Sequence, residues 1–244
     1  MSPASTLYVD LDGSLIATDL LHESLLKLLR EAPLTLLNLP GWWLHGKAFL
    51  KREVASRVDI DVTTLPYRPE VLQFIRDARA AGRRIVLATA SDFKFAQRIA
   101  EHLNMFDAVL ASDGVRNLGG RGKLAAMQID AAGGGFCYLG DRAVDLKVWR
   151  GADSAVVVTR SRSLVRPAAR ATRIDAHIKP AAVSLRRYLY AIRLHQWLKN
   201  VLIFLPLMPV LHELSWRIVF DAGLAFLAFG LMASGIYVVN DLLD

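Results

Sequence analysis

The stretch Thr6-Leu-Tyr-Val-Asp10-Leu-Asp12-Gly13 decides the fold of the first part of this 244-residue chain. A short, mostly apolar run leads into two acidic residues and a glycine, which is typical of a buried parallel strand that ends in a polar turn. Residues i and i+2 of a strand point to the same face. We therefore expect Asp10 and Asp12 to face one cavity at the carboxyl end of this strand.

Apolar strands and helices alternate through the first 160 or so residues. The pattern predicts helices at 70–81 and 93–103, and further strands at 84–89, 108–111, 135–139 and 155–158. Such alternation implies right-handed crossovers and a parallel sheet that is covered on both faces. The expected fold class is α/β with a Rossmann-like sheet, in which sites form where the strands end.

Polar clusters follow the predicted strands at those positions. Two carboxylates as close as Asp10 and Asp12 need a cation, and Mg²⁺ suits oxygen ligands beside phosphate. Asp10 is expected to attack phosphorus and form an aspartyl-phosphate. Asp12 is expected to protonate the leaving oxygen and later to deprotonate water. Asp141 and Asp145, in a Gly-Asp-x-x-x-Asp turn, are expected to complete the metal site.

Two further groups are expected to stabilise the phosphoryl group. Thr89, at a strand end, offers a hydroxyl, and Lys123 offers a positive charge for the developing negative charge. Ser91 competes with Thr89, because the apolar run does not decide which hydroxyl ends the strand. Taken singly, an Asp-x-Asp pair is usually a solvated turn and Lys123 a surface lysine. The order of these residues and their placement at strand ends together favour a catalytic site.

These residues resemble the haloacid-dehalogenase-like (HAD) superfamily, whose four motifs occur in order over residues 6 to 160 or so. The resemblance implies phosphatase rather than dehalogenase chemistry, with Mg²⁺ held by Asp10, the Asp12 carbonyl and Asp141. It also implies a helical cap over about 15–67, in which Asp19 and Glu23 would face the substrate. The expected phosphatase domain comprises residues 1–175.

The net charge of +7 is concentrated in one block. Between Arg160 and Lys199 there are ten Lys and Arg residues, opposed only by Asp175. The block precedes an apolar tail, so residues 176–200 are expected to be a basic juxtamembrane linker that contacts anionic lipid. Nucleic acid is not expected as a partner, because no helix-turn-helix or aromatic-interleaved basic motif accompanies the charge.

The apolar tail predicts one or two membrane helices. Residues 218–239 are long enough to span a bilayer and contain one charge, Asp221. Residues 201–211 contain two prolines and suggest a kinked or interfacial first helix; a buried helix of a soluble protein is the alternative. Since Asp10 precedes any segment of signal-peptide type, the phosphatase domain is expected in the cytoplasm, attached to the membrane.

The tail resembles the start of the UbiA-type intramembrane prenyltransferase superfamily. The candidate transferase motif comprises Lys199 and Asn200 in a polar, aromatic belt, followed by Asn240, Asp241 and Asp244. The resemblance implies Mg²⁺-dependent transfer involving a polyprenyl (di)phosphate, with residues 201–244 as the start of the membrane domain. That family has further helices and a second aspartate-rich motif, so we expect either a truncated, inactive transferase or a tail that merely anchors the phosphatase.

The sequence therefore predicts Mg²⁺-dependent phosphomonoester hydrolysis beside a membrane transferase. The expected substrate is a phosphorylated small molecule or a polyprenyl-linked sugar phosphate. One alternative makes the transferase the main activity and the HAD domain an accessory. A second alternative makes the N-terminal domain a regulatory module with little turnover, although the intact pair Asp10 and Asp12 opposes it.

Overall fold

A computed structural model describes residues 6–182, 184, 186, 189–190, 193–213 and 215–243. The chain divides into two compact units, Met1–Pro180 and Ala181–Asp244. We describe each unit by itself.

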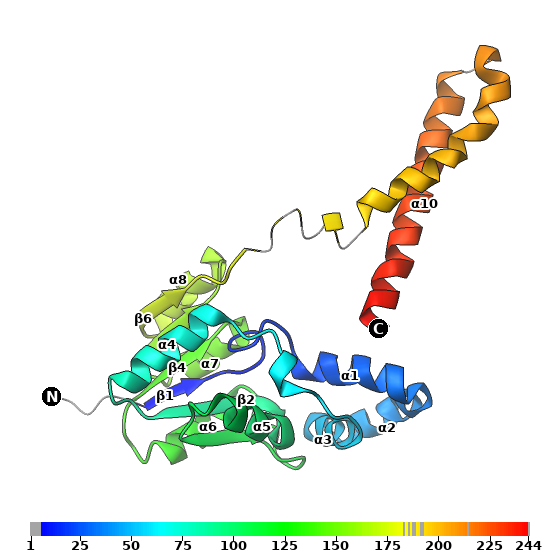
Figure 1. The fold of residues 1–244 in the computed structure, drawn as a ribbon. Coiled ribbons are helices and arrows are strands. Elements are labelled where there is room, and N and C mark those ends of the chain that lie inside the picture. Colours follow the sequence, from blue (N-terminus) through cyan, green and yellow to red (C-terminus); the bar gives the residue numbers. More distant parts are fainter. Residues whose placement is uncertain are drawn as a thin grey trace. The chain divides into compact units, whose positions relative to one another are not determined.

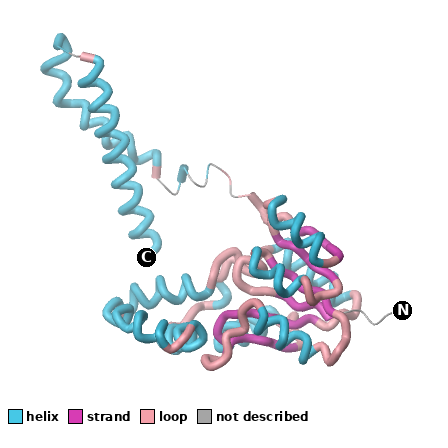
Figure 2. Tube along the Cα trace, turned by 180° about the vertical axis from the view of Figure 1, so that it is seen from behind, coloured by secondary structure: helices cyan, strands magenta, loops and turns pink. Residues whose placement is uncertain are grey.

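The first unit is built on a six-stranded parallel sheet (Figures 1 and 2). The strands follow the spatial order β3-β2-β1-β4-β5-β6, so the chain moves outward from β1 in one direction and then returns to its other side. The bounds are β1 Thr6–Val9, β2 Ile85–Asp92, β3 Ala108–Ser112, β4 Phe136–Gly140, β5 Ser154–Val158 and β6 Arg173–Ile178. The expected α/β class with a parallel sheet is confirmed.

Helices cover both faces of this sheet, and the alternation along β1 shows why. Leu7 and Val9 point into one core, which α4 (Pro69–Ala80) and α5 (Phe93–Leu103) complete. Tyr8, between them, points into the other core. That second core is completed by α6 Arg121–Asp130, α7 Leu146–Trp149 and α8 Arg162–Ala171. A short 3-10 helix, η3, spans Ala143–Asp145.

A helical insertion lies between β1 and α4, where the cap was expected (Figure 1). It comprises α1 Leu20–Glu31, η1 Pro33–Asn38, α2 Leu39–Leu44, α3 Lys47–Arg57 and η2 Val62–Thr64. Its two ends lie side by side, because Ile16 forms bridges with both Asp12 and Tyr67. The Arg68 amide also donates to the Leu15 carbonyl oxygen at 2.9 Å. We refer to these paired ends as the neck of the cap.

The structure differs from the sequence-based expectation at two strands. β2 continues to Asp92 through an irregularity in its pairing with β3, so Thr89 lies inside the strand and not at its end. β6 was not expected, and its residues 176–178 fall in the segment assigned to the linker. The alternating burial of β6 is typical of an edge strand, whose polar side chains face solvent.

The second unit contains a 3-10 helix, η4 (Leu194–Glu213), and a long α-helix, α10 (Trp216–Leu243). In the described part of the chain one helix, over Trp216–Asp241, is long and apolar enough to cross a membrane. The second expected span, around 201–211, is not among such helices. The two elements pack together, and the Trp197 indole Nε1 donates to Ser234 Oγ at 2.9 Å.

Candidate active site

The candidate site lies where the strand order reverses. Asp10 follows β1 and Asp141 follows β4, and these two strands are neighbours in the sheet. From β1 the chain continues to β2 on one side, and from β4 it continues to β5 on the other side. The Asp10 amide donates to the Leu139 carbonyl oxygen at 3.0 Å, which aligns the two strand ends. Ligand sites of open α/β sheets form at this kind of switch point.

Three carboxylates gather there. Asp10, Asp141 and Asp145 each offer an oxygen atom, and these atoms all lie within 4.8 Å of one another. Opposite ligands of a hexacoordinate Mg²⁺ lie about 4.2 Å apart, since each Mg–O bond is about 2.1 Å. The three oxygens are therefore close enough to share one such ion, and their chemistry fits a hard cation.

A buried network of hydrogen bonds connects this cluster to Lys123. The ammonium Nζ of Lys123 donates to Asp10 Oδ1 at 2.6 Å and to the Tyr138 hydroxyl at 2.9 Å. The Tyr138 hydroxyl donates in turn to Asp145 Oδ1 at 3.0 Å. Lys123 is only 5% exposed, which rules out the surface-lysine interpretation.

Burial and mutual repulsion alter the proton affinity of the cluster. Burial, followed by the negative charge of Asp10, raises the pKa of Asp141 to about 7. The same two causes, in the same order, raise the pKa of Asp145. Two cationic groups, the Lys123 ammonium and the Arg142 guanidinium 3.9 Å from Asp141, face three carboxylates. The cluster therefore has too little positive charge around it, and a divalent cation would supply the deficit.

Glycines make room for these carboxylates. Gly13 has a φ of +81°, and a Cβ atom there would lie 2.3 Å from Asp141 Oδ2. A Cβ on Gly140 would lie 2.7 Å from Asp145 Oδ2. Ser14 Oγ donates to Asp141 Oδ1 at 2.9 Å, on the same turn as Gly13. The turn after β1 therefore approaches the turn after β4 more closely than a larger residue at position 13 or 140 would permit.

Asp12 has different partners from Asp10, although only one residue separates them. Its carboxylate accepts from the Leu20 amide at 2.9 Å and from Ser91 Oγ at 2.5 Å. Thr89 Oγ1 lies 3.4 Å from Asp12 Oδ2. Burial raises the pKa of Asp12, which favours a protonated carboxyl group. Both candidate hydroxyls thus lie beside the proposed acid, and the choice between Thr89 and Ser91 as phosphate ligand stays a prediction.

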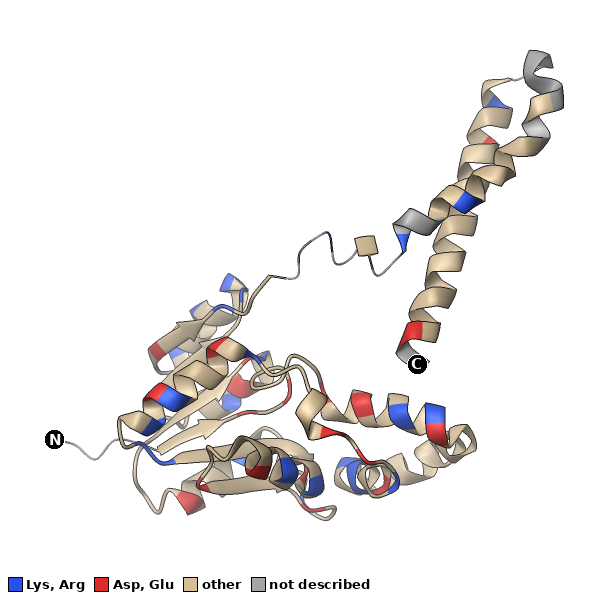
Figure 3. Cartoon of the chain, viewed as in Figure 1, with Lys and Arg blue, Asp and Glu red and all other residues tan. Residues whose placement is uncertain are grey.

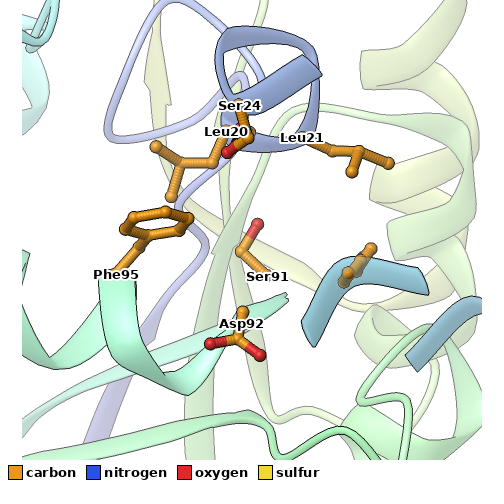
Figure 4. A pocket seen from close by; sticks show the side chains of 7 residues that line it. Leu20, Leu21, Ser24, Ser91, Asp92 and Phe95 are labelled. Atoms are coloured by element: carbon orange, nitrogen blue, oxygen red, sulfur yellow. Dashed lines mark hydrogen bonds between the residues drawn. The ribbon is translucent and has the colours of Figure 1, made fainter. Parts of the chain in front are cut away.

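A pocket opens beside Asp12, between the cap and the sheet (Figure 4). Ser91 and Leu20, which both bind the Asp12 carboxylate, are among its lining residues. The complete lining is Leu20, Leu21, Ser24, Lys51, Ser91, Asp92 and Phe95. The cavity is about 10 Å³, room for about one water molecule. This cavity is therefore too small to hold a substrate in this structure.

Lys51 is a site residue that sequence reasoning missed. It lies on α3 of the cap, and its Nζ donates to the Ala90 carbonyl oxygen at 2.6 Å, across the pocket on β2. Burial lowers its pKa. Its position in a mixed basic and apolar helix carries no motif, so only the fold reveals it. Arg142 was also missed; its Nη2 donates to the Asp12 carbonyl oxygen at 2.9 Å.

The two predicted cap residues are not among those that line the pocket. Asp19 caps α1 by accepting from the Leu21 amide at 3.0 Å, and it lies 3.4 Å from Arg142 Nη2. Glu23 accepts from Thr18 Oγ1 at 2.6 Å. Both carboxylates have local partners at the start of the cap, and a substrate contact for either stays a prediction.

The candidate transferase residues lie in the second unit. Lys199 and Asn200 line a small pocket between η4 and α10, together with Arg193, Trp197, Ala233, Ser234 and Tyr237. Arg193 forms an ion pair with Asp241. Asn240 lies on α10, and Asp244 is outside the described residues.

The sequence profile of the haloacid dehalogenase-like hydrolase family matches residues 7–150. The uncharacterized protein y4nM of Sinorhizobium fredii is 39% identical over 241 residues, which cover 98% of this chain and 46% of that protein. The nodulation protein NoeC of Azorhizobium caulinodans is 41% identical over 70 residues, which cover 26% of this chain and 20% of that protein. The chain thus spans about half of y4nM.

Solved structures share the fold of the first unit. A protein of unknown function from Bordetella pertussis has 18% identity and a TM-score of 0.54, covering 71% of this chain and 98% of its own. A substrate-bound phosphoserine phosphatase has 14% identity and a TM-score of 0.51, covering 78% of this chain and 99% of its own. With the profile match and the acidic cluster, the conclusion is that this chain belongs to the haloacid dehalogenase-like hydrolase family.

Proposed function

We propose that the first unit hydrolyses phosphomonoesters through an aspartyl-phosphate on Asp10. The observation that carries this proposal is that the side chains of Asp10 and Asp12 have different neighbours. Asp10 lies in a cluster suited to a cation and contacts the Lys123 ammonium group at 2.6 Å. Asp12 lies outside that cluster, with a raised pKa and beside the pocket. A nucleophile and a general acid need these two different environments.

The reaction would proceed in two displacements. An oxygen of Asp10 attacks phosphorus, the bond to the leaving oxygen breaks, and that oxygen takes the proton of the Asp12 carboxyl group. A water molecule then attacks the phosphoryl group and gives its proton to the Asp12 carboxylate. The Asp10–phosphorus bond breaks and inorganic phosphate leaves. Lys123 stabilises the negative charge on the phosphoryl oxygens.

The proposed ligands for Mg²⁺ are Asp10, Asp141 and Asp145, whose oxygens the structure brings together. When bound, the ion would neutralise phosphoryl charge and align the group for in-line attack. The Asp12 carboxylate lies outside this cluster, so a contribution of Asp12 to the metal would come from its backbone carbonyl, which accepts from Arg142 Nη2 in this structure. Tyr138 and Ser14 fix the orientation of Asp145 and Asp141 by hydrogen bonds.

The pocket restricts the proposed substrate class. Its lining combines three apolar side chains with the Lys51 ammonium group, the Asp92 carboxylate and two serine hydroxyls. We therefore favour a phosphorylated small molecule whose leaving group has both apolar and polar parts. A polyprenyl-linked sugar phosphate is a second substrate to test, because an apolar helix follows in the same chain.

Trapping the intermediate tests the proposal. The full chain is incubated with Mg²⁺ and an aryl phosphate, then reduced with borohydride, which converts aspartyl-phosphate to homoserine. Mass spectrometry should find homoserine at position 10. Asp113→Asn, at an exposed aspartate, serves as the matched control and should leave the label unchanged. Homoserine at another position, or none despite Mg²⁺-dependent turnover, would refute Asp10 as the nucleophile.

We further propose that α10 anchors the protein in a membrane with the first unit in the cytoplasm. Apolar side chains along α10 are exposed in this chain, including Phe220, Leu224 and Leu231. A core helix of a soluble domain would bury such a surface. Co-purification with membranes after alkaline washing is the expected result, and release by alkali would contradict it.

A UbiA-type transferase is the second candidate function, in which the HAD unit is an accessory. One observation favours it: Lys199 and Asn200 line a pocket together with Arg193, and Arg193 forms an ion pair with Asp241 of the candidate motif. The proposed polyprenyl (di)phosphate would bind near these residues. Mg²⁺-dependent binding of a polyprenyl diphosphate by the full chain, lost in Asp241→Asn, is the expected result. Binding unaffected by that variant would exclude the assignment.

A further inference from the structure

A second cavity lies on the first unit and is lined mainly by basic side chains. The lining residues are Arg160, Arg162, Val165, His177 and Lys179, from the turn after β5, the start of α8 and the end of β6. We call it the basic pocket. Its volume of about 440 Å³ is ample for a phosphate group. None of its residues belongs to the acidic cluster or to the pocket beneath the cap.

Two of the basic side chains support the walls of this pocket. Arg160 Nη1 donates to the Pro180 carbonyl oxygen at 3.0 Å, and His177 Nε2 lies 2.8 Å from the Thr159 carbonyl oxygen. Arg162 and Lys179 are exposed and lie at the same pocket. The pocket is thus held in shape by one pair of residues, while the other pair presents positive charge.

The surrounding surface has little compensating negative charge. Among residues 160–180 the one acidic residue is Asp175, which accepts from Ser154 Oγ at 2.5 Å and from Arg173 Nε at 3.0 Å. Arg162, Arg166 and Arg170 succeed one another at intervals of four and share the exposed face of α8, opposite buried Leu164 and Ala168 (Figure 3). Like charges at this spacing repel one another. An anionic partner would relieve that repulsion.

The position of this surface in the chain indicates where such a partner would come from. Lys179 is 37 residues before the start of the candidate membrane helix at Trp216. Basic segments close to a membrane helix are attracted to the anionic lipids of the cytoplasmic leaflet. The structure shows that part of the basic block is a folded surface with a cavity, and not simply a linker.

We propose that the basic pocket and the arginine face of α8 bind the phosphate headgroups of anionic lipids, and so hold the HAD unit against the bilayer. This proposal rests on the proposed membrane anchorage by α10. It assigns a binding site separate from the hydrolytic site. Arg162 and Lys179 provide the headgroup contacts, and the arginine face adds long-range attraction.

Energy transfer in nanodiscs tests the proposal with the full chain. Ala169→Cys, on the exposed side of α8, accepts a donor dye, while Cys137 is buried and does not react in the folded protein. An acceptor dye is carried by lipid headgroups. Transfer should be high in discs that contain equal parts of phosphatidylcholine and phosphatidylglycerol. It should be low in phosphatidylcholine alone, and it should fall in high salt.

The double variant R162S/K179S should weaken docking about 25-fold, since each basic side chain near an anionic surface contributes about fivefold. The matched control is R76S/R79S on α4, which removes the same charge elsewhere and should dock almost as the parent does. Equal weakening in both double variants would overturn the proposal, because it would reveal a net-charge effect.

The remaining outcomes separate the possible failures. If the protein is incorporated into discs but the energy transfer does not depend on the lipid, headgroup binding is refuted and the membrane role of α10 is not. Failure to incorporate into either kind of disc would refute the membrane role of α10 and the present proposal with it. Inorganic phosphate that abolishes docking at millimolar concentration, in an assay where sulfate does not, would show a site for soluble phosphate and would overturn the lipid assignment.

Discussion

Asp10 and Asp12 are two residues apart in sequence, yet their surroundings differ almost completely. Asp10 lies among charged groups, with Lys123, Asp141 and Asp145 as neighbours, and we call these four residues the charged corner. Asp12 belongs to a corner of neutral donors, where Ser91 Oγ and the Leu20 amide hold its carboxylate. The first corner is formed by the turns after β1 and β4 together with Lys123 of α6, whereas the second is completed by the cap.

The difference shows how one turn supports two kinds of chemistry. In the charged corner, Asp10 contacts the Lys123 ammonium group and lies beside the other two proposed metal ligands, which is a suitable setting for a nucleophile that attacks phosphorus. In the neutral corner, burial raises the pKa of Asp12 and favours a carboxyl group that can donate a proton. The following predictions test whether the two corners are as distinct in function as they are in structure.

The largest effect is expected for Asp10→Asn. The amide is a poor nucleophile, so turnover should fall by at least about 10⁴-fold for every phosphate ester tested. Steady-state assays with an aryl and an alkyl phosphate should show the same loss, because the attacking group is missing in both. Residual activity within tenfold of the parent would contradict the assignment of Asp10.

A leaving-group-dependent effect is expected for Asp12→Asn. An alkyl phosphate, whose leaving oxygen needs a proton, should lose about 10²–10⁴-fold in the first displacement. A nitrophenyl phosphate, whose leaving group is already stable as an anion, should lose far less in the same step. Single-turnover kinetics measure this step separately from hydrolysis of the intermediate. Equal losses for the two substrates would mean that Asp12 does not act as the acid.

The charged corner should make the metal-free protein less stable as the pH rises. The folded pKa of Asp141 is about 7, raised from 3.8, so the folded state holds a proton that the unfolded chain lacks between those values. The free energy of unfolding should therefore fall between about pH 4 and pH 7, by at most about 4 kcal/mol for this group. Urea titrations in a chelator measure the fall, and Asp141→Asn should flatten it.

Magnesium should reverse that loss. Because Mg²⁺ binds ionised carboxylates, its stabilisation should be larger at about pH 8 than at about pH 5. Stability that rises with pH in the absence of metal would contradict the charge deficit described for this corner.

A smaller effect is expected for Ser91→Ala. The variant loses the 2.5 Å hydrogen bond to Asp12, which lowers the pKa of that carboxyl group in the parent. Activity should fall roughly tenfold, and the limb of the pH–rate profile that reports the acid should shift to higher pH. Thr89→Ser keeps a hydroxyl beside Asp12 and serves as the control. A shift to lower pH would show that Ser91 does not stabilise the charged form.

The sheet and much of the charged corner follow from local sequence. Apolar runs that end in Asp10 and Asp141 predict parallel strands, and parallel strands bring their carboxyl ends together. The helix predicted over 93–103 is observed as α5, Phe93–Leu103. β6 was missed because its alternation of polar and apolar residues lies inside a strongly basic block, where charge hides the strand signal.

The neutral corner was harder to predict because its partners come from elements far apart in sequence. Lys51 reaches the pocket from α3, and nothing in its neighbours distinguishes it from a surface lysine. One partner in the charged corner was equally hidden: Tyr138 lies within a buried apolar strand, so its sequence position gives no sign that its hydroxyl connects Lys123 with Asp145. Side-chain direction and cap placement are tertiary properties, and a pattern within one segment does not encode them.

The neck of the cap has a consequence for how such a protein can diversify. Because Ile16 pairs with Tyr67, the insertion leaves the sheet and returns to it at nearly the same point. Helices between these two positions can be lengthened, shortened or replaced without disturbing the strands that carry Asp10 and Asp141. The cap, which we propose contacts the substrate, is thus free to change independently of the strand ends that we propose handle phosphorus.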